Sequence, residues 1–239
     1  MPDTPYRTAL IVGVGGGVSA SVARIFAKAG IKIALASRRV TELAALAKEV
    51  GGEAFACDVT KRGDVVRLFG EVERAFGAPD VVVYNPSYRT RGPFIELDPA
   101  EVEKTLTVSA FGGFLVAQEA VKRMLPHKHG AILFTGASAA LRGKAAFAAF
   151  AAAKAGLRMV SQSFAREFGP RGIHVAHAII DGLIEGDKIF SVVPDIAQRK
   201  GPDGLLDPNA IAEGYWYLHT QHRSVWSQEI DFRPHAEAF

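Results

Sequence analysis

A glycine-rich stretch near the N-terminus is the first group of residues whose type and spacing could do chemistry. An apolar run at 8–13 leads into Gly13-Val-Gly15-Gly16-Gly17-Val18-Ser19. Glycines let the backbone turn tightly and approach a phosphate, and a helix beginning there points its N–H groups at the charge. Val18 stands where G-x-G-x-x-G needs its third glycine, so the match is better to G-x-x-x-G-x-G, with Ser19 in the last position. We expect a nucleotide to bind at Gly13, Gly15, Gly17 and Val18, the alternative being a glycine turn without a ligand.

Two arginines follow the next apolar run, in Ser37-Arg38-Arg39. An acidic residue usually holds the ribose 2′-hydroxyl of a dinucleotide at this place, and the sequence has none there. Arginine can grip a 2′-phosphate through two hydrogen bonds. We therefore expect Ser37 and Arg38 to bind the cofactor and NADP(H) to be preferred, with NAD(H) possible. The alternative is a solvated pair of arginines at the start of a helix.

Short apolar runs that alternate with helical periodicity must position these residues. Each run has the length of a buried strand. They lie at 8–13, 31–36, 54–57, 81–84, 131–135, 173–180 and 229–232. Long helical stretches are expected at about 98–124 and 145–169. The alternation predicts an α/β fold, a Rossmann-type doubly wound parallel sheet of about seven strands flanked by helices, in one dinucleotide-binding domain over 1–239.

One segment, 182–206, breaks this rhythm after the sixth run. It is rich in glycine and proline and has mixed charge. Long connections in compact domains are often lids, and ligands of open α/β sheets bind at the carboxyl ends of the strands, where this segment starts. We expect 182–206 to be a substrate lid.

Composition excludes several classes of protein. The chain has 239 residues, 49% hydrophobic and 22% charged, with a net charge of +3, which is ordinary for a globular protein and weak support for nucleic-acid binding. Cys57 is the single cysteine, which fits a reducing compartment. The start of the chain, 1–5, has no basic leader signature, and no apolar run reaches membrane-spanning length. We expect a cytoplasmic protein without membrane, nucleic-acid or metal partners, and we interpret His127 and His129 as residues of a solvated loop.

Taken together, these features resemble the short-chain dehydrogenase/reductase family over nearly the whole length. Cys57-Asp58-Val59 resembles the family's Asp-Val element, whose Asp contacts the adenine amine. Asn85 matches the Asn that supports the cofactor pocket, although an Asn-Pro turn explains it equally well. Asp181-Gly182 stands where the family has Pro-Gly, and the resemblance implies that Ile184 faces the nicotinamide amide.

The catalytic positions of that family match less completely. Members use a Tyr four residues before a Lys, a Ser on the preceding strand and often an Asn on the helix before. Lys154 is present, but Phe150 occupies the Tyr position and Phe147 the variant position seven before the Lys. Ser138 matches the catalytic Ser, with Thr135 as an alternative. The Asn position is Ser109.

The missing hydroxyl leaves the proton donor open. Tyr88 and Asp181 are possible substitute acids, although a loop-packing role for Tyr88 and a turn role for Asp181 are strong alternatives. Lys154 lies on an apolar helical stripe, where burial is costly unless the lysine is paired or bound. We expect it to bind the cofactor ribose, the alternative being a lysine that extends to the surface. His177 is interpreted as a core or interface histidine.

Three functions follow as expectations. The first is hydride transfer between NADP(H) and a small carbonyl or alcohol substrate, with a non-standard proton donor. The second is a non-catalytic NADP(H)-binding sensor, and the third is a structural subunit of a hetero-oligomer. The resemblance implies a homodimer or homotetramer, and the alanine-rich stretch 145–155 would permit close helix contact.

Overall fold

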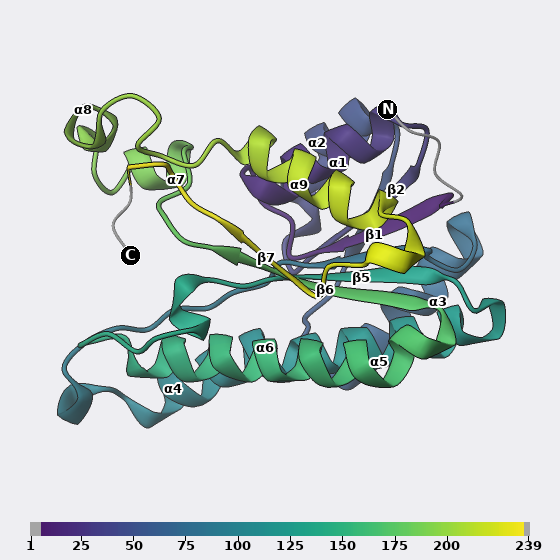
Figure 1. Cartoon of the computed structure of the whole chain (residues 1–239), viewed down its shortest axis with the longest axis horizontal. Coiled ribbons are helices and arrows are strands. Elements are labelled where there is room, and N and C mark those ends of the chain that lie inside the picture. The colour runs from purple at the N-terminus through teal and green to yellow at the C-terminus, as the bar shows by residue number, and fades with distance from the viewer. Residues whose placement is uncertain (1–5, 237–239) are drawn as a thin grey trace.

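The computed structural model describes residues 6–236 and is built on a sheet of seven strands within that range (Figure 1). All pairings are parallel, in the order β3-β2-β1-β4-β5-β6-β7. The strands are β1 (Thr8–Val12), β2 (Lys32–Ser37), β3 (Glu53–Ala56), β4 (Val81–Tyr84), β5 (Gly130–Thr135), β6 (Ile173–Ile180) and β7 (Glu229–Phe232). The predicted doubly wound parallel sheet is confirmed. Because β1 lies between β2 and β4, the strand order reverses there, which is where such sheets open a ligand crevice.

Helices cover both faces of the sheet. One face carries α1, α2 and α9, and the other carries α3, α4, α5 and α6 (Figure 1). Their bounds are α1 (Val18–Lys28), α2 (Ala44–Val50), α3 (Arg62–Phe76), α4 (Pro99–Leu106), α5 (Gly112–Met124), α6 (Ala148–Phe168), α7 (Asp187–Phe190), α8 (Ile196–Lys200) and α9 (Pro208–Thr220). Among the described helices, none combines the length and apolar character needed to span a bilayer. Residues 1–5, on which the expectation of no leader rests, lie outside the described range.

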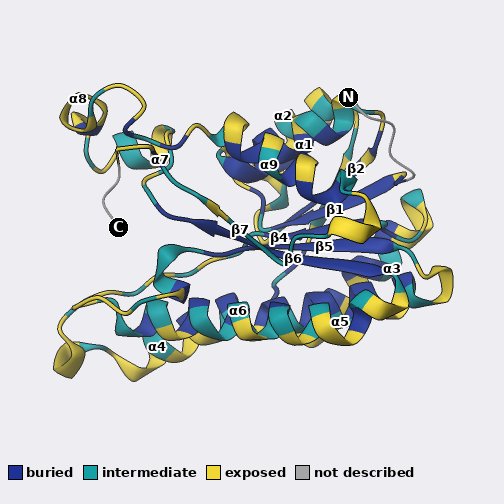
Figure 2. Ribbon diagram, viewed as in Figure 1, coloured by how far each residue is buried: buried dark blue, intermediate teal, exposed yellow. Residues whose placement is uncertain are grey.

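Two hydrophobic clusters, one on each face, hold the helices to the sheet (Figure 2). Successive strand residues face opposite sides, so Ile11 joins the cluster of Phe26 and Tyr215, while its neighbour Leu10 joins that of Phe69. Full burial of each such side chain contributes about 1.5–3 kcal/mol. Since both faces are covered, the central strands β1, β4 and β5 consist mainly of buried apolar residues.

The helical stretch expected at 98–124 is present, and its hydrogen-bond pattern changes in the middle. Asp98 caps α4 by accepting a hydrogen bond from the backbone N–H of Ala100 at 2.9 Å. A π-helical turn at Thr107–Phe111 then separates α4 from α5. The Tyr84 hydroxyl donates to the carbonyl of Val108 within this turn. Such bulges are frequent at functional sites, and this one brings the helix against the end of β4.

The segment 182–206, which we expect to be a lid, contains two short helices, α7 and α8. Its two ends are clipped together by a parallel bridge between Ile184 and Leu206. The Glu185 N–H donates to the carbonyl of Leu206 at 2.9 Å, and the Leu206 N–H donates to that of Leu183 at 2.8 Å. In Figure 1 this segment extends past the sheet on the same side as the loop joining β4 to α4.

Candidate functional site

The glycine turn after β1 is held tightly at its first residue. Gly13 has φ of 81°, and its N–H donates to the carbonyl of Ala36 in β2 at 2.9 Å. A Cβ at Gly13 would stand 2.5 Å from the nitrogen of Pro86. Both the backbone conformation and the close approach therefore require glycine here.

Asn85 locks this turn to the end of β4. Its side-chain amide donates to the Ser19 hydroxyl at 2.6 Å and lies 3.5 Å from the Gly13 carbonyl. The Ser19 hydroxyl in turn donates to the Gly13 carbonyl at 3.2 Å. Because the Ser19 hydroxyl makes its hydrogen bonds within the turn, Ser19 and Asn85 fix the conformation of the turn.

The outer part of the turn is open. A Cβ at Gly15, Gly16 or Gly17 would meet no atom within 4 Å. α1 begins at Val18 without a side-chain cap or an acidic residue in its first turn, so its N-terminal N–H groups face this space. Open backbone at a helix N-terminus suits an anion such as a pyrophosphate.

This contrast gives a paired prediction. Gly13→Ala is expected to lower the free energy of unfolding by about 2–4 kcal/mol, because it adds backbone strain to a clash with Pro86. Gly15→Ala is expected to change it by less than about 0.5 kcal/mol, yet to weaken NADPH binding by about tenfold or more by narrowing the phosphate approach. Urea denaturation and calorimetric titration measure the two effects. Equal stability losses in both variants would contradict this account.

The end of β2 offers one arginine without a carboxylate partner. Arg39 forms an ion pair with Glu42 at 3.0 Å, and its backbone N–H donates to the Ser37 hydroxyl. Arg38 is exposed and makes no ion pair or hydrogen bond with another side chain in the part of the chain that the structure describes. Of the two arginines, Arg38 is therefore the one available to a phosphate.

Asp58 and Val59 follow β3 at the same edge. The Asp58 carboxylate accepts hydrogen bonds from the N–H and hydroxyl of Thr60 at 3.1 and 2.8 Å. Burial raises the pKa of Asp58, but these bonds and the charges of Arg38 and Lys61 outweigh it, so the net shift is downward. Val59 is buried, and a Cβ at Gly112 would lie 3.0 Å from it.

Lys154 lies inside the protein instead of extending to the surface. Its side chain in α6 is only 3% exposed, and its ammonium donates to the carbonyl of Thr135 at the end of β5 at 2.9 Å. Burial lowers the pKa of Lys154 to about 8. The Phe150 ring is next to it, with 5.9 Å between the Lys154 nitrogen and the ring centroid. The predicted helical pairing of Phe150 with Lys154 is present in the structure.

The hydroxyls near Lys154 have different surroundings. The Thr135 hydroxyl is bonded to that of Tyr215 at 2.6 Å, in α9 on the opposite face of the sheet from α6. Ser138 is half-buried in a turn at Ser138–Ala140, with no side-chain hydrogen bond in the described residues. Of the two alternatives for the Ser position, only Ser138 has a hydroxyl left for a ligand. Ser109 is fully buried in the π-helical turn, and its hydroxyl has no partner there.

The two substitute acids are engaged elsewhere. The Tyr88 hydroxyl bonds to Glu101 in α4, and Lys104 lies 4.0 Å from the centre of its ring. The buried Asp181 carboxylate forms an ion pair with Arg142 at 3.3 Å. These contacts tie the loop after β4 to α4, and the end of β6 to the loop after β5.

His177 in β6 is fully buried, as expected of a core histidine. Its Nδ1 lies 2.9 Å from a carboxylate oxygen of Glu229, which Arg158 also contacts through two 2.7 Å hydrogen bonds. Burial lowers the pKa of His177, and Glu229 offsets this only in part. The His129 ring packs at a tilt against the Tyr6 ring, with 4.4 Å between the ring centroids, and lies 3.8 Å from Asp80. The described residues contain no group of three or more potential metal ligands.

Contacts between the loop after β4 and the segment at the start of α6 were not predicted from the sequence. The Arg89 guanidinium carbon lies 6.0 Å from the centre of the Phe150 ring. The N–H of Gly92 donates to the carbonyl of Ala146 at 3.0 Å, where Ala146 has φ of 65°. The only hint in the sequence is an Arg-Thr-Arg-Gly-Pro stretch after β4.

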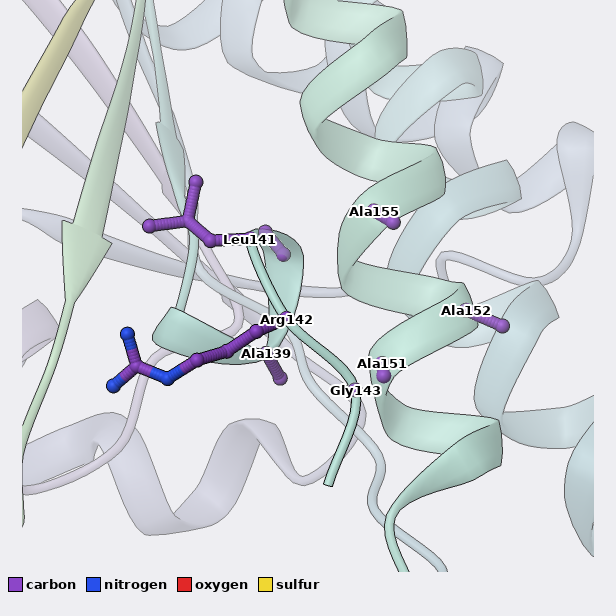
Figure 3. Close-up of a pocket in the computed structure, with 8 residues that line it drawn as sticks. Ala139, Leu141, Arg142, Gly143, Ala151, Ala152 and Ala155 are labelled. Carbon is purple, nitrogen blue, oxygen red and sulfur yellow. The ribbon is translucent and has the colours of Figure 1, made fainter. Parts of the chain in front are cut away.

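A shallow cavity of about 270 Å³ lies beside the loop after β5 (Figure 3). Small side chains of α6 form one wall and the loop forms the other. The lining residues are Ala139, Ala140, Leu141, Arg142, Gly143, Ala151, Ala152 and Ala155. The Arg142 side chain points away from α6 (Figure 3). The lining thus consists mainly of small apolar groups, and it does not include Phe150 or Lys154.

Comparison with known proteins agrees with this arrangement. Residues 7–189 match the short-chain dehydrogenase family, and the chain belongs to it. Its members are oxidoreductases that bind NAD(P). D-Threitol dehydrogenase of Mycolicibacterium smegmatis is 32% identical over 174 residues, covering 71% of this chain and 67% of that protein.

Solved structures share the fold. A short-chain dehydrogenase from Rhodopseudomonas palustris is 33% identical with a TM-score of 0.81, covering 96% of this chain and 99% of that one. An actinorhodin polyketide ketoreductase, solved with NADPH, has a TM-score of 0.87 at 22% identity, with 96% of each chain covered. The latter likeness shows the fold alone.

Proposed function

We propose that this protein is an NADP(H)-dependent oxidoreductase that interconverts a carbonyl compound and an alcohol with a non-standard proton donor. The observation that carries the proposal is the buried Lys154, held at the carboxyl edge of the sheet that also bears the open glycine turn. Burying a lysine without an ionic partner costs free energy, and a buried, strongly perturbed lysine at this edge favours a functional role for its ammonium. The name of the D-threitol dehydrogenase supports this reaction class.

The residues at the sheet edge fit a phosphorylated dinucleotide. The open backbone at Gly15–17 and the uncapped start of α1 suit its pyrophosphate. Arg38, with no acidic residue beside it at the end of β2, suits a 2′-phosphate, so NADP(H) is preferred over NAD(H). We assign Asp58, Val59 and Asn85 to the adenine and pocket walls, and Ile184 to the nicotinamide end. When bound, the dinucleotide supplies or accepts the hydride.

We assign the proton to Lys154, because Phe150 stands at the position of the family's catalytic Tyr and has no hydroxyl. A lysine with a pKa of about 8 is mostly protonated at neutral pH, yet it is a stronger acid than an exposed lysine. Its ammonium can protonate the developing alkoxide directly or through one water, while the Ser138 hydroxyl orients the carbonyl. Tyr88 and Asp181 are weaker candidates, because Glu101 and Arg142 already engage them.

Calorimetric titration with NADPH and NADH tests the cofactor assignment. The wild type is expected to bind NADPH more tightly than NADH. Arg38→Ala should lose about tenfold of the affinity for NADPH and little of that for NADH, since one charge-assisted contact is removed. Arg39→Ala is the matched control, because Glu42 already engages that arginine. Binding of neither dinucleotide would overturn the proposal, and equal binding of both would overturn the preference.

The second candidate is an NADP(H)-binding sensor without catalysis, which Phe150 specifically favours. It predicts tight NADPH binding with no turnover of any carbonyl or alcohol. In either function, we propose that 182–206 acts as the lid, that the protein is cytoplasmic, and that it forms a homodimer or homotetramer. Exposed apolar side chains, Phe111 beside α5 and Met159 on α6, support the last point. A mixed oligomer isolated from the native host would favour a structural subunit instead.

A further inference from the structure

Two segments near Phe150 and Lys154 carry positive charge without any acidic residue: the loop after β4, and the stretch from the end of β5 into α6. The segments 85–93 and 136–154 contain no Asp or Glu. Their cationic residues are Arg89, Arg91, Arg142, Lys144 and Lys154. Charges of one sign that line a site raise the local concentration of ligands of the opposite sign.

Two of these cations are already committed. Arg142 turns away from α6 and forms its ion pair with the buried Asp181 (Figure 3). Lys154 is enclosed and bonded to the carbonyl of Thr135. Arg89, Arg91 and Lys144 are all exposed, and of these only Arg89 lies over an aromatic ring in the described residues. Arg89 is the remaining cation, and it lies beside the Phe150 ring next to Lys154.

Arg89 shares the Phe150 ring with Lys154. Its guanidinium carbon is 6.0 Å and the lysine nitrogen 5.9 Å from the same ring centroid. The negative face of an aromatic ring attracts each cation but cannot cancel two of them. No carboxylate side chain pairs with Arg89 in the described part of the chain. An anion from outside the chain would complete this arrangement.

The short segment that carries Arg89 is fastened on both sides. Before it, the Tyr88 hydroxyl is bonded to Glu101. After it, the Gly92 N–H is bonded to the carbonyl of Ala146, whose positive φ is a strained conformation for a residue with a Cβ. An arginine held between two anchored residues loses less conformational freedom when it binds a ligand.

We propose that Arg89 binds an anionic group of the substrate beside Phe150, so that the protein acts on carbonyl compounds that carry a carboxylate or a phosphate ester. The planar guanidinium pairs with either anion through two hydrogen bonds. This inference rests on the proposed function, and it adds the substrate class. Arg38, at the end of β2, is assigned to the cofactor, so the two arginines have separable roles.

Matched pairs of substrates test the inference with the full-length protein. The pairs are acetoacetate with methyl acetoacetate, pyruvate with methyl pyruvate, and dihydroxyacetone phosphate with dihydroxyacetone. The wild type is expected to reduce the anionic member of at least one pair with a kcat/KM about tenfold or more above that of its neutral partner. A preference for acetoacetate and pyruvate identifies the anion as a carboxylate, and a preference for dihydroxyacetone phosphate identifies it as a phosphate ester. Arg89→Gln should lose about 10- to 100-fold on the anion, mainly through KM, and little on the neutral partner.

Two controls distinguish a failure of this inference from a failure of the proposed function. Arg89→Gln should bind NADPH as the wild type does, and Arg91→Gln should keep the preference for the anion. Thermal unfolding of the NADP⁺ complex, which holds no hydride to transfer, adds a readout independent of turnover: the same anions should raise the midpoint in the wild type and not in Arg89→Gln. If neither NADPH nor NADH binds, the proposed function fails. The shifts of the unfolding midpoint caused by the anions are then measured on the protein without a dinucleotide. Equal rates for anionic and neutral partners, or anion-induced shifts that Arg89→Gln retains, would overturn the role of Arg89.

Discussion

Replacing Phe150 with tyrosine is expected to raise the rate of carbonyl reduction by about tenfold or more, because a phenol would add a second proton donor beside Lys154. The ring already lies close to two cations, Lys154 and Arg89. Nearby positive charge favours a phenolate, so a hydroxyl on this ring would have a pKa below that of a free tyrosine. Single-turnover oxidation of NADPH, measured with anionic and neutral carbonyl compounds, gives the rate.

Phe147→Tyr is the matched control for this gain. Phe147 is one helical turn earlier, at the N-cap of α6, and its ring is not among those that Lys154 approaches. A hydroxyl there should leave the rate unchanged. If Phe150→Tyr binds NADPH normally and still shows no gain, the ring does not face a carbonyl, and the non-catalytic binder becomes the better description.

The backbone of the site was predictable because local patterns determine it. Alternating apolar runs located the strands and predicted a doubly wound sheet, and the glycines after β1 marked a turn whose φ at Gly13 only glycine adopts easily. Helical spacing placed Phe150 and Lys154 one turn apart on α6. Each of these inferences depends on residues fewer than ten positions apart, where backbone geometry alone settles the neighbours.

Contacts between distant segments were not predictable in this way. The Thr135 and Tyr215 hydroxyls meet across 80 positions, so the choice between Thr135 and Ser138 stayed open in the sequence. Arg89 lies in the loop after β4 and Phe150 in the first turn of α6, and only the folded sheet brings these two segments together. The π-helical turn was missed because its residues are ordinary helix formers, and contact with Tyr84 of β4 accompanies it. Side-chain partners of this kind depend on tertiary packing, which periodicity does not encode.

Lys154→Met is expected to lower the rate of carbonyl reduction by about 10²- to 10⁴-fold, since the proposed proton donor is removed. In the wild type the single-turnover rate should fall as the pH rises through about 8, where the buried ammonium loses its proton. The variant should lose this dependence and keep only a slow, flat rate. Lys144→Met, at an exposed lysine of the loop after β5, should retain both the rate and the profile. A wild-type rate unaffected between pH 7 and 10 would exclude Lys154 as the donor.

The same titration should appear in protein stability, independently of any activity. Burial lowers the pKa of Lys154 from 10.5 to about 8, so between these values the unfolded chain holds a proton that the folded protein has released. Stability therefore rises with pH across this window, by up to about 3 kcal/mol for the full shift, and the penalty of the buried charge is fully present below pH 8. Burial also raises the pKa of Cys57 and Tyr6 to about 12, so these groups add their own pH dependence to stability. The measurement is therefore the difference in unfolding free energy between the wild type and Lys154→Met at each pH. A difference that rises from pH 8 to 10.5 shows a lysine that the fold keeps buried at a cost in stability, and a difference independent of pH would show that its ammonium is solvated and unsuited to act as the acid.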